Sequence, residues 1–169
     1  MRLPLEWLHD HVRPDLEPRE LATRLAMTGT EVDRIDHHGV GALEHFVVGR
    51  VLEAVQHPDA DRLRVCTVDV GEAEPSTIVC GAPNVATGQT VAVARPGAVM
   101  PDGTRLKKAK LRGVPSEGMI LAEDEVAIGT DHDGIMVLDD HLVDAEIAPG
   151  SPLEQFLPIA TEVLELEIT

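Results

Sequence analysis

A run of basic residues is the strongest candidate for a binding site in this chain. Residues 95–112 hold six of the fourteen basic side chains, including all three lysines, and only one acid, although the formal net charge is −16. If residues 105–112 form a β-strand, alternation places Lys108, Lys110 and Arg112 on one face. Such a row of cations is suited to the phosphate backbone of a nucleic acid. It is also typical of an exposed strand that lysines protect from aggregation, so the pattern alone leaves both interpretations open.

The residues just after this run add polar and flexible side chains. Ser116 and Glu117 are expected to be exposed, where they could hydrogen-bond RNA bases or ribose hydroxyl groups. Met119 could pack against a base. Each of these three residues is weak evidence for RNA binding by itself. They are candidates because they follow the cations directly along the chain.

Two other polar clusters have some features of a metal site. Residues 57–61 contain one histidine and two aspartates, but no further ligand is fixed by spacing, and the same residue types form ordinary turns. Residues 131–134 share features with a calcium loop, yet the best alignment places Gly129 at the first ligand position and Asp140 where a bidentate glutamate belongs. The sequence therefore predicts no metal site.

No pattern of residues predicts an active site in this segment. Ser116 has no histidine or lysine spaced to activate it, and the chain lacks a G-x-S-x-G motif, a P-loop and a dinucleotide-binding glycine motif. Cys66 and Cys80 have no partners at zinc-binding spacing. We expect them to be reduced thiols buried in strands, with a disulfide as the less favoured alternative.

Composition limits the architecture and the partners. A chain of 169 residues is long enough for one core, or for a small domain inserted in another, and with 2% aromatic residues that core must be aliphatic. No apolar run approaches the roughly 20 residues that span a membrane, and no signal peptide is evident, so we expect a cytoplasmic protein without a membrane partner. Residues 113–169 carry fourteen acids and no lysine or arginine, so the acidic tail that follows residues 116–119 cannot be the face that binds RNA.

The segment 1–38 is predicted to be the first half of a small α/β domain. Apolar residues at helical spacing predict one helix before Pro14 and a second from Pro18 to about Gly29. An extended stretch follows at 31–36.

Short β-type runs separated by turn residues fill residues 43–124. Five or six short strands in a segment of this length predict a small closed barrel, and the OB-fold is the commonest barrel of that size. The predicted strands are 46–55, 62–70, 77–80, 90–95, 105–112 and 119–122.

The C-terminal part is predicted to complete the α/β domain. A strand is expected at 135–138, a helical turn at 152–156, and a last strand at 163–168 that could pair with 31–36. The expected fold is mainly β with α+β flanks: a five-stranded OB-fold β-barrel inserted in a small split α/β domain. The predicted domains are 1–38 and 149–169 for the two halves of the split domain, and 39–148 for the barrel domain.

Four ordered motifs resemble those of the tRNA-binding OB domain family, which includes stand-alone tRNA-binding proteins, C-terminal appendages of methionyl-tRNA synthetases and cytokine-like eukaryotic members. They are H-P-D-A-D-R-L-R-V-C-T-V-D-V-G from His57, I-V-C-G-A-P-N-V from Ile78, V-A-V-A-R-P-G-A-V-M-P from Val91 and K-L-R-G-V-P-S-E-G-M from Lys110. The resemblance implies RNA contacts through the residues that match the motif, with two neighbouring lysines added for their charge. These residues are Asn84, Lys107, Lys108, Lys110, Arg112, Ser116, Glu117 and Met119.

The flanks are similar to the N-terminal region of bacterial phenylalanyl-tRNA synthetase β subunits. L-E-W-L-H-D-H-V, L-A-T-R-L-A-M-T-G-T-E-V-D, D-H-D-G-I and the terminal L-E-L-E-I-T carry this likeness, which extends over essentially the whole chain. It implies a non-catalytic segment, without a cofactor of its own, of a ligase that uses ATP and magnesium. The implied partners are tRNA(Phe), the α subunit and further β-subunit domains beyond Thr169, in an α2β2 heterotetramer.

Two alternatives stay open from the sequence. The barrel and its host domain could be a docking module of the synthetase, with the basic run against an acidic protein surface. A free-standing tRNA-binding protein is the other alternative, but it would leave the split host strands on either side of the barrel without a reason.

Overall fold

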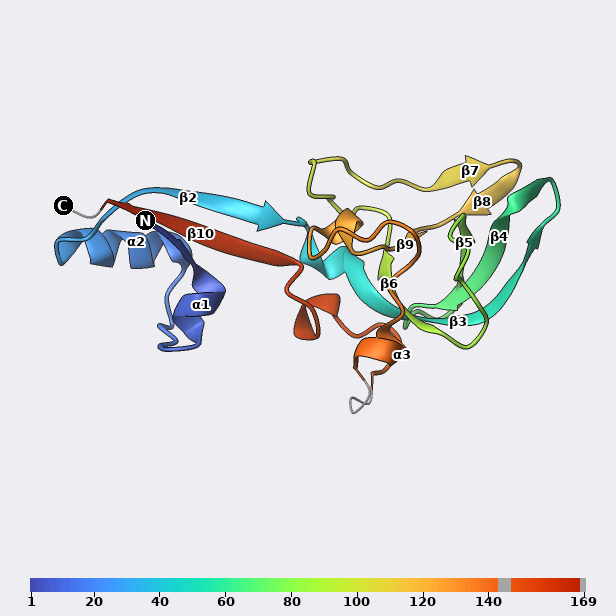
Figure 1. Ribbon diagram of the computed structural model, residues 1–169, viewed down its shortest axis with the longest axis horizontal. Coiled ribbons are helices and arrows are strands. Elements are labelled where there is room, and N and C mark those ends of the chain that lie inside the picture. The colour runs from blue at the N-terminus through green and yellow to red at the C-terminus, as the bar shows by residue number, and fades with distance from the viewer. Residues whose placement is uncertain (143–146, 168–169) are drawn as a thin grey trace. The chain divides into compact units, whose positions relative to one another are not determined.

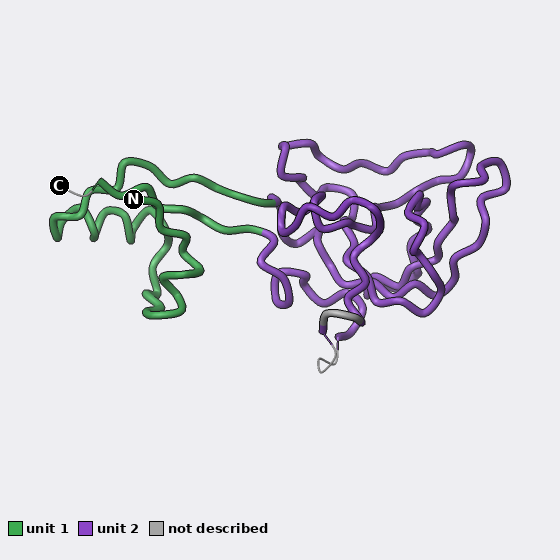
Figure 2. The backbone as a smooth tube through the Cα atoms, viewed as in Figure 1, with its two compact units in different colours: residues 1–39, 160–169 green, residues 40–159 purple. Residues whose placement is uncertain are grey.

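The structure is a computed structural model that describes residues 1–142 and 147–167. The chain forms two compact units, one from residues 1–39 with 160–169 and one from residues 40–159 (Figure 2). The second unit is thus inserted between the two segments of the first. Residues 149–159, which the sequence assigned to the split domain, cluster with the barrel.

The first unit is a three-stranded antiparallel sheet with two helices on one side of it (Figure 1). Leu164 pairs with Ile35, which confirms the predicted pairing of residues 31–36 with the last strand. Pro18 begins the second helix, where its missing N–H costs no hydrogen bond. The strand order is β1 (Arg2–Pro4), β10 (Ala160–Glu167) and β2 (Glu31–Gly39), and the helices are α1 (Leu5–His9) and α2 (Pro18–Met27).

Leucines join the helices of this unit to its sheet. Leu21 of α2 packs with Leu164 and Leu166 of β10, and partly buried leucines of α1 complete the cluster. Because side chains alternate along a strand, Glu165, which lies between Leu164 and Leu166, points to the other face of the sheet.

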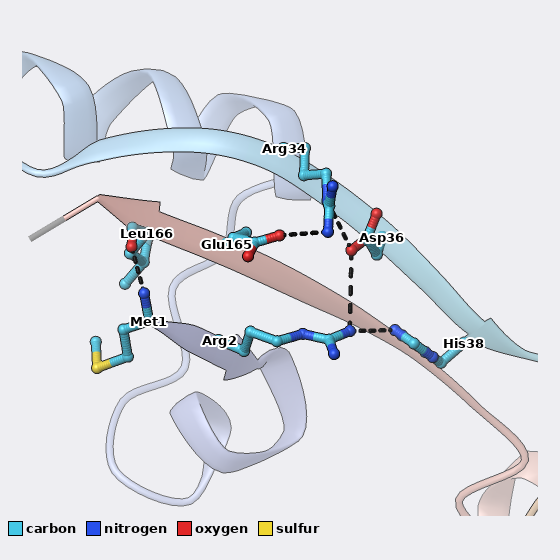
Figure 3. Close-up of polar contacts among 7 residues, drawn as sticks. All are labelled: Met1, Arg2, Arg34, Asp36, His38, Glu165 and Leu166. Carbon is cyan, nitrogen blue, oxygen red and sulfur yellow. Dashed lines mark hydrogen bonds and ion pairs between the residues drawn. The ribbon is translucent and has the colours of Figure 1, made fainter.

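That other face carries charged side chains from all three strands (Figure 3). Arg34 Nη2 lies 2.6 Å from Glu165 Oε2, and Arg34 Nε donates to Asp36 Oδ2 at 3.0 Å. Arg2 Nη2 lies 3.0 Å from His38 Nε2 and 3.9 Å from Asp36 Oδ2. Since Arg2, Glu165 and Arg34 are direct neighbours across the strands, these contacts favour the observed register. Exposed pairs of this kind contribute only about 0–1 kcal/mol each.

The second unit is built on a five-stranded antiparallel sheet that curls into a nearly closed barrel, as predicted (Figure 1). The longest strand, β3 (Phe46–His57), pairs with β6 (Thr90–Ala94) through its first half and with β4 (Ala60–Asp69) through its second half. Arg50 lies in both ladders. Phe46 is fully buried, and the rest of the core is mostly aliphatic. The strand order is β5 (Ser76–Cys80), β4, β3, β6 and β9 (Met119–Ile120).

The predicted barrel strand at residues 105–112 is wrong. Within this range Arg105 makes a single β-bridge to Val99 and only Ala109–Leu111 form a strand, β7, which pairs with β8 (Val114–Ser116) in a separate two-stranded sheet. All three residues of β7 are exposed, so this strand has no face buried in the barrel.

Between the barrel and β10 the chain is mostly irregular, with short helical turns. The strand predicted at 135–138 is wrong, because there only Val137 makes a β-bridge, to Val91, and a short helix starts at the next residue. The predicted helical turn near Pro152 is confirmed. The short helices of this unit are η1 (Leu43–His45), η2 (Asp124–Val126), α3 (Leu138–His141) and η3 (Leu153–Gln155).

Both cysteines are free and buried in barrel strands, as predicted. Burial raises the pKa of the Cys66 thiol to about 11, so this thiol stays protonated at neutral pH. Across the described part of the chain, no helix is long and apolar enough to cross a membrane.

Candidate nucleic-acid interface

The β7–β8 hairpin presents the centre of the basic run. Its tip is a two-residue turn in which Arg112 and Gly113 both have positive φ angles, 46° and 88°. This turn type matches the twist of the two strands and needs an unhindered residue such as glycine. Arg112 therefore lies in the turn and not on a strand face. Lys108 precedes the strand, so the predicted row of Lys108, Lys110 and Arg112 on one face is wrong.

Buried contacts hold this hairpin against the barrel. The Ser116 hydroxyl accepts a hydrogen bond from Val79 N–H at 3.0 Å and donates to the Gly118 carbonyl at 3.2 Å. The next residue along the chain, Glu117, donates its backbone N–H to the Thr77 carbonyl at 2.8 Å. Ser116 is only 4% exposed, so its predicted exposure is wrong. The Ser116 hydroxyl thus bonds the outer edge of β5. A fully closed barrel would have a ladder at this edge, joining β5 to β9.

Replacing Ser116 with alanine will destabilise the barrel unit. The substitution leaves the buried Val79 N–H without its partner, which costs about 1–3 kcal/mol. The matched control, Thr130→Ala, alters an exposed residue and will change stability by no more than about 0.5 kcal/mol. Urea unfolding followed by far-UV circular dichroism measures both. Equal midpoints for the two variants would show that the Ser116 hydroxyl is not part of the closure.

His57 is a second anchor, and its role was missed from the sequence. The ring is 2% exposed, and its Nδ1 accepts from Asp59 N–H at 3.0 Å. Its Nε2 lies 3.2 Å from the Leu111 carbonyl, so the ring proton sits on Nε2 and donates to the hairpin next to Arg112. The local H-P-D pattern signals a turn, but it carries no information on a partner far along the chain.

Ion pairs divide the cations of the basic run into two groups. Lys108 Nζ lies 2.6 Å from Glu117 Oε1, and the hydrogen bond and charge of that carboxylate raise the pKa of Lys108. Arg95 is likewise paired with Glu72 at 3.1 Å. These two cations are already neutralised by acids of the same chain.

The second group is open to solvent. Lys107, Lys110 and Arg112 are exposed, and within residues 1–142 and 147–167 none of them has an ion-pair partner. We call these three residues the unpaired cations. Arg105 is also exposed and makes no ion pair within the described part of the chain, but its Nη1 donates to the Gly97 carbonyl at 3.1 Å. The geometry therefore directs attention from Lys108 to Lys107 as the lysine available for an anion.

Asn84 uses its side-chain amide inside the fold. Its Oδ1 accepts from Ile135 N–H and its Nδ2 donates to the Ile135 carbonyl, each at 2.9 Å. Both ends of the amide are thus engaged in fixing the segment after the barrel. An RNA contact by Asn84 would have to use the remaining hydrogen-bonding capacity of this group.

Met119 is half-buried at the start of β9 and lines two cavities of about 310 and 430 Å³. Its side chain is thus accessible from two sides, unlike that of Ser116. No group of three or more histidine, cysteine or acidic residues that could hold a metal ion occurs among the residues described.

A comparison of the sequence with known families matches residues 46–147 to the family described as "Putative tRNA binding domain". The matched span contains the barrel and the hairpin with all three unpaired cations.

Curated relatives match along the whole chain. The phenylalanine–tRNA ligase β subunits of Nitratidesulfovibrio vulgaris, Coxiella burnetii and Bacteroides thetaiotaomicron are 48%, 46% and 45% identical to it. Each alignment covers 100% of this chain but only 20%, 20% and 21% of the relative. The chain thus spans about a fifth of the length of the curated relatives it matches.

Two solved structures are also similar. A C-terminal domain of Plasmodium vivax p43 is 31% identical with a TM-score of 0.37, over 44% of this chain and 43% of the other. A protein related to methionyl-tRNA synthetase from Pyrococcus horikoshii is 24% identical with a TM-score of 0.44, over 63% and 85% of the two chains.

Proposed function

This chain belongs to the putative tRNA-binding domain family, and we propose that it is the tRNA-contacting, non-catalytic N-terminal segment of a phenylalanine–tRNA ligase β subunit. The family match supports tRNA as the ligand. The 42–48% identity to β subunits along the full chain supports the parent enzyme.

The observation that carries the RNA contact is the position of the unpaired cations. Lys107, Lys110 and Arg112 are exposed on or beside a hairpin that Ser116 and His57 anchor to the barrel. An anchored hairpin holds its charges at fixed positions, which lowers the conformational entropy lost on binding a polyanion. At physiological salt, screening over about 8 Å limits the repulsion from acids elsewhere on the chain.

The parent enzyme supplies the rest of the proposal. In it, this segment assists the ATP- and magnesium-dependent aminoacylation of tRNA(Phe) in the cytoplasm, while the α subunit and the remaining β-subunit domains carry the chemistry. An α2β2 assembly is part of this proposal. The segment itself contributes positive charge and shape to tRNA binding.

The salt dependence of tRNA binding tests the RNA contact. For three phosphate contacts, the slope of log affinity against log salt will be about −2, because each contact adds roughly −0.7. We expect weak binding of a tRNA(Phe) transcript in a filter assay between 25 and 200 mM salt. Lys110→Gln will make the slope shallower by about 0.7, as one phosphate contact is lost.

The matched control is Lys108→Gln, which removes a lysine that Glu117 already pairs. It will change the slope less than Lys110→Gln does. A wild-type chain that retains no tRNA at 25 mM salt, or a slope near zero, would refute the RNA contact and favour the docking alternative.

A further inference from the structure

No β-ladder closes the barrel between the two edge strands of its sheet in the described part of the chain, although Ser116 and Glu117 bond part of the β5 edge. β5 pairs only with β4 and β9 pairs only with β6 in the described part of the chain, so no ladder joins β5 to β9. Edge strands carry backbone N–H and C=O groups that lack a strand partner. The cavity of about 310 Å³ lies at the seam between these two strands, with Cys80 of β5 and Met119 of β9 in its walls and Pro83 beside them.

A second cavity, of about 430 Å³, continues from the first. The two share Met119 and Glu125 as lining residues. The outer wall of the second cavity comes from the loop before β7 and includes Met100, Arg105 and Lys107. We call the two cavities together the seam groove, defined by Cys80, Pro83, Met100, Lys107, Met119 and Glu125.

The seam groove carries charged side chains of both signs along its length. Asp102, Arg105, Lys107 and Asp124 line the second cavity, His132 and Asp133 line the first, and Glu125 lines both. Carboxylates outnumber the lysine and the arginine along the groove, so it suits an uncharged group that donates hydrogen bonds and not a phosphate. The flexible thioether of Met119 lines both cavities, where it can pack against a flat ring.

Glu125 is held in a defined position where the two cavities meet. Its Oε2 accepts from Ala122 N–H at 2.7 Å, and its Oε1 has no hydrogen-bond partner among the described residues. A carboxylate oxygen only accepts hydrogen bonds when ionised. The group it recognises must accordingly present N–H donors.

We propose that the seam groove binds one unstacked RNA base, and that it prefers guanine. This inference rests on the proposed RNA-binding function and specifies which feature of the RNA is recognised. Guanine presents two neighbouring N–H groups on its Watson–Crick edge to Glu125, whereas uracil presents a single N–H between two carbonyl oxygens that a carboxylate repels. Bases inside a duplex cannot enter, so the groove selects unpaired nucleotides.

Methionine methyl signals report on this groove directly. The chain has five methionines. Met119 and Met100 line the groove, whereas Met27 is 83% exposed in the other unit and Met136 is buried. With the full chain labelled at the methionine methyl carbons, the pentanucleotide U-U-G-U-U will shift the Met119 and Met100 signals. The Met27 and Met136 signals will stay in place, and U-U-U-U-U will bind about tenfold more weakly.

Glu125→Gln separates base recognition from general RNA binding. The glutamine keeps an acceptor for Ala122 N–H but offers no carboxylate, so the tenfold preference for the guanine pentamer will disappear. The matched control is Glu123→Gln, which changes the same charge two residues away and will leave the preference intact. Equal affinity of the wild type for the two pentamers, or shifts confined to other methionines, would overturn the base site while tRNA binding through the unpaired cations still stood. Absence of any RNA binding would overturn both.

Discussion

Replacing Lys107, Lys110 and Arg112 with glutamate will reduce tRNA affinity by roughly 100- to 1,000-fold at 50 mM salt. Each of these residues is exposed and unpaired, so each can release counterions when it contacts phosphate. At this salt concentration one such contact is worth about a factor of ten in affinity. The three introduced glutamates also repel the phosphates of the bound tRNA. Filter retention of labelled tRNA against protein concentration measures the effect.

The matched control moves the same charge on the other unit. Arg13, Arg19 and Arg24 are exposed, and their replacement with glutamate also takes the formal net charge from −16 to −22, through three changes of −2. This control will change tRNA affinity by less than about threefold, because these arginines lie outside the tRNA-binding family match at 46–147 and screening limits the reach of an exposed charge to about 14 Å at 50 mM salt. Equal losses in the two triple variants would mean that net charge, and not the hairpin, governs binding.

The choice of Lys107 in place of Lys108 shows where the sequence was insufficient for the site. Strand alternation grouped Lys108 with Lys110 and Arg112, and that grouping assumed an unbroken strand. The Arg112-Gly113 turn ends the strand, and Glu117 approaches Lys108 only because the hairpin folds back on itself. Turn residues are visible in a sequence, but the pairing of an exposed lysine with one of several nearby acids is not.

Local patterns were sufficient for most of the fold. The alternation in residues 163–168 predicted a strand with one buried face, and the structure places Leu164 and Leu166 in the core. Pro18 marked a helix start correctly. Long-range polar contacts were not predictable in this way. The bonds from Ser116 to Val79 and from Asn84 to Ile135 join residues whose separation along the chain no periodicity encodes.

The second large effect is expected on stability, at a point where the backbone near Gly150 lies very close to the backbone at residues 70–71. Gly150 has a φ of 84°, and a Cβ atom added there would lie 2.7 Å from Gly71 Cα and 3.0 Å from the Val70 carbonyl oxygen. Gly150 N–H also donates to the Val48 carbonyl at 2.8 Å, which ties this segment to β3. Both obstacles are backbone atoms, so the clash cannot be relieved by a change of rotamer.

Gly150→Ala will therefore lower the free energy of unfolding of the barrel unit by more than the cost of placing alanine at a positive φ angle. The matched control is Gly88→Ala, where φ is 91° but no atom lies within 4 Å of the added Cβ. Both variants incur about 1–2 kcal/mol for the left-handed conformation. Only Gly150→Ala adds an overlap, worth about 1–3 kcal/mol or more. Urea unfolding by far-UV circular dichroism compares them, and equal losses would contradict the close approach.

Stability and RNA binding are expected to respond differently to Gly150→Ala and to the triple glutamate variant. The Gly71–Gly150 contact lies outside the hairpin and the seam groove, so Gly150→Ala that is still folded at low temperature will bind tRNA as the wild type does. The triple glutamate variant will show the reverse, with unfolding close to that of the wild type and greatly reduced binding. A single property, such as a generally loosened barrel, cannot produce both results. The pair of variants therefore separates the residues that build the barrel from the unpaired cations that use it.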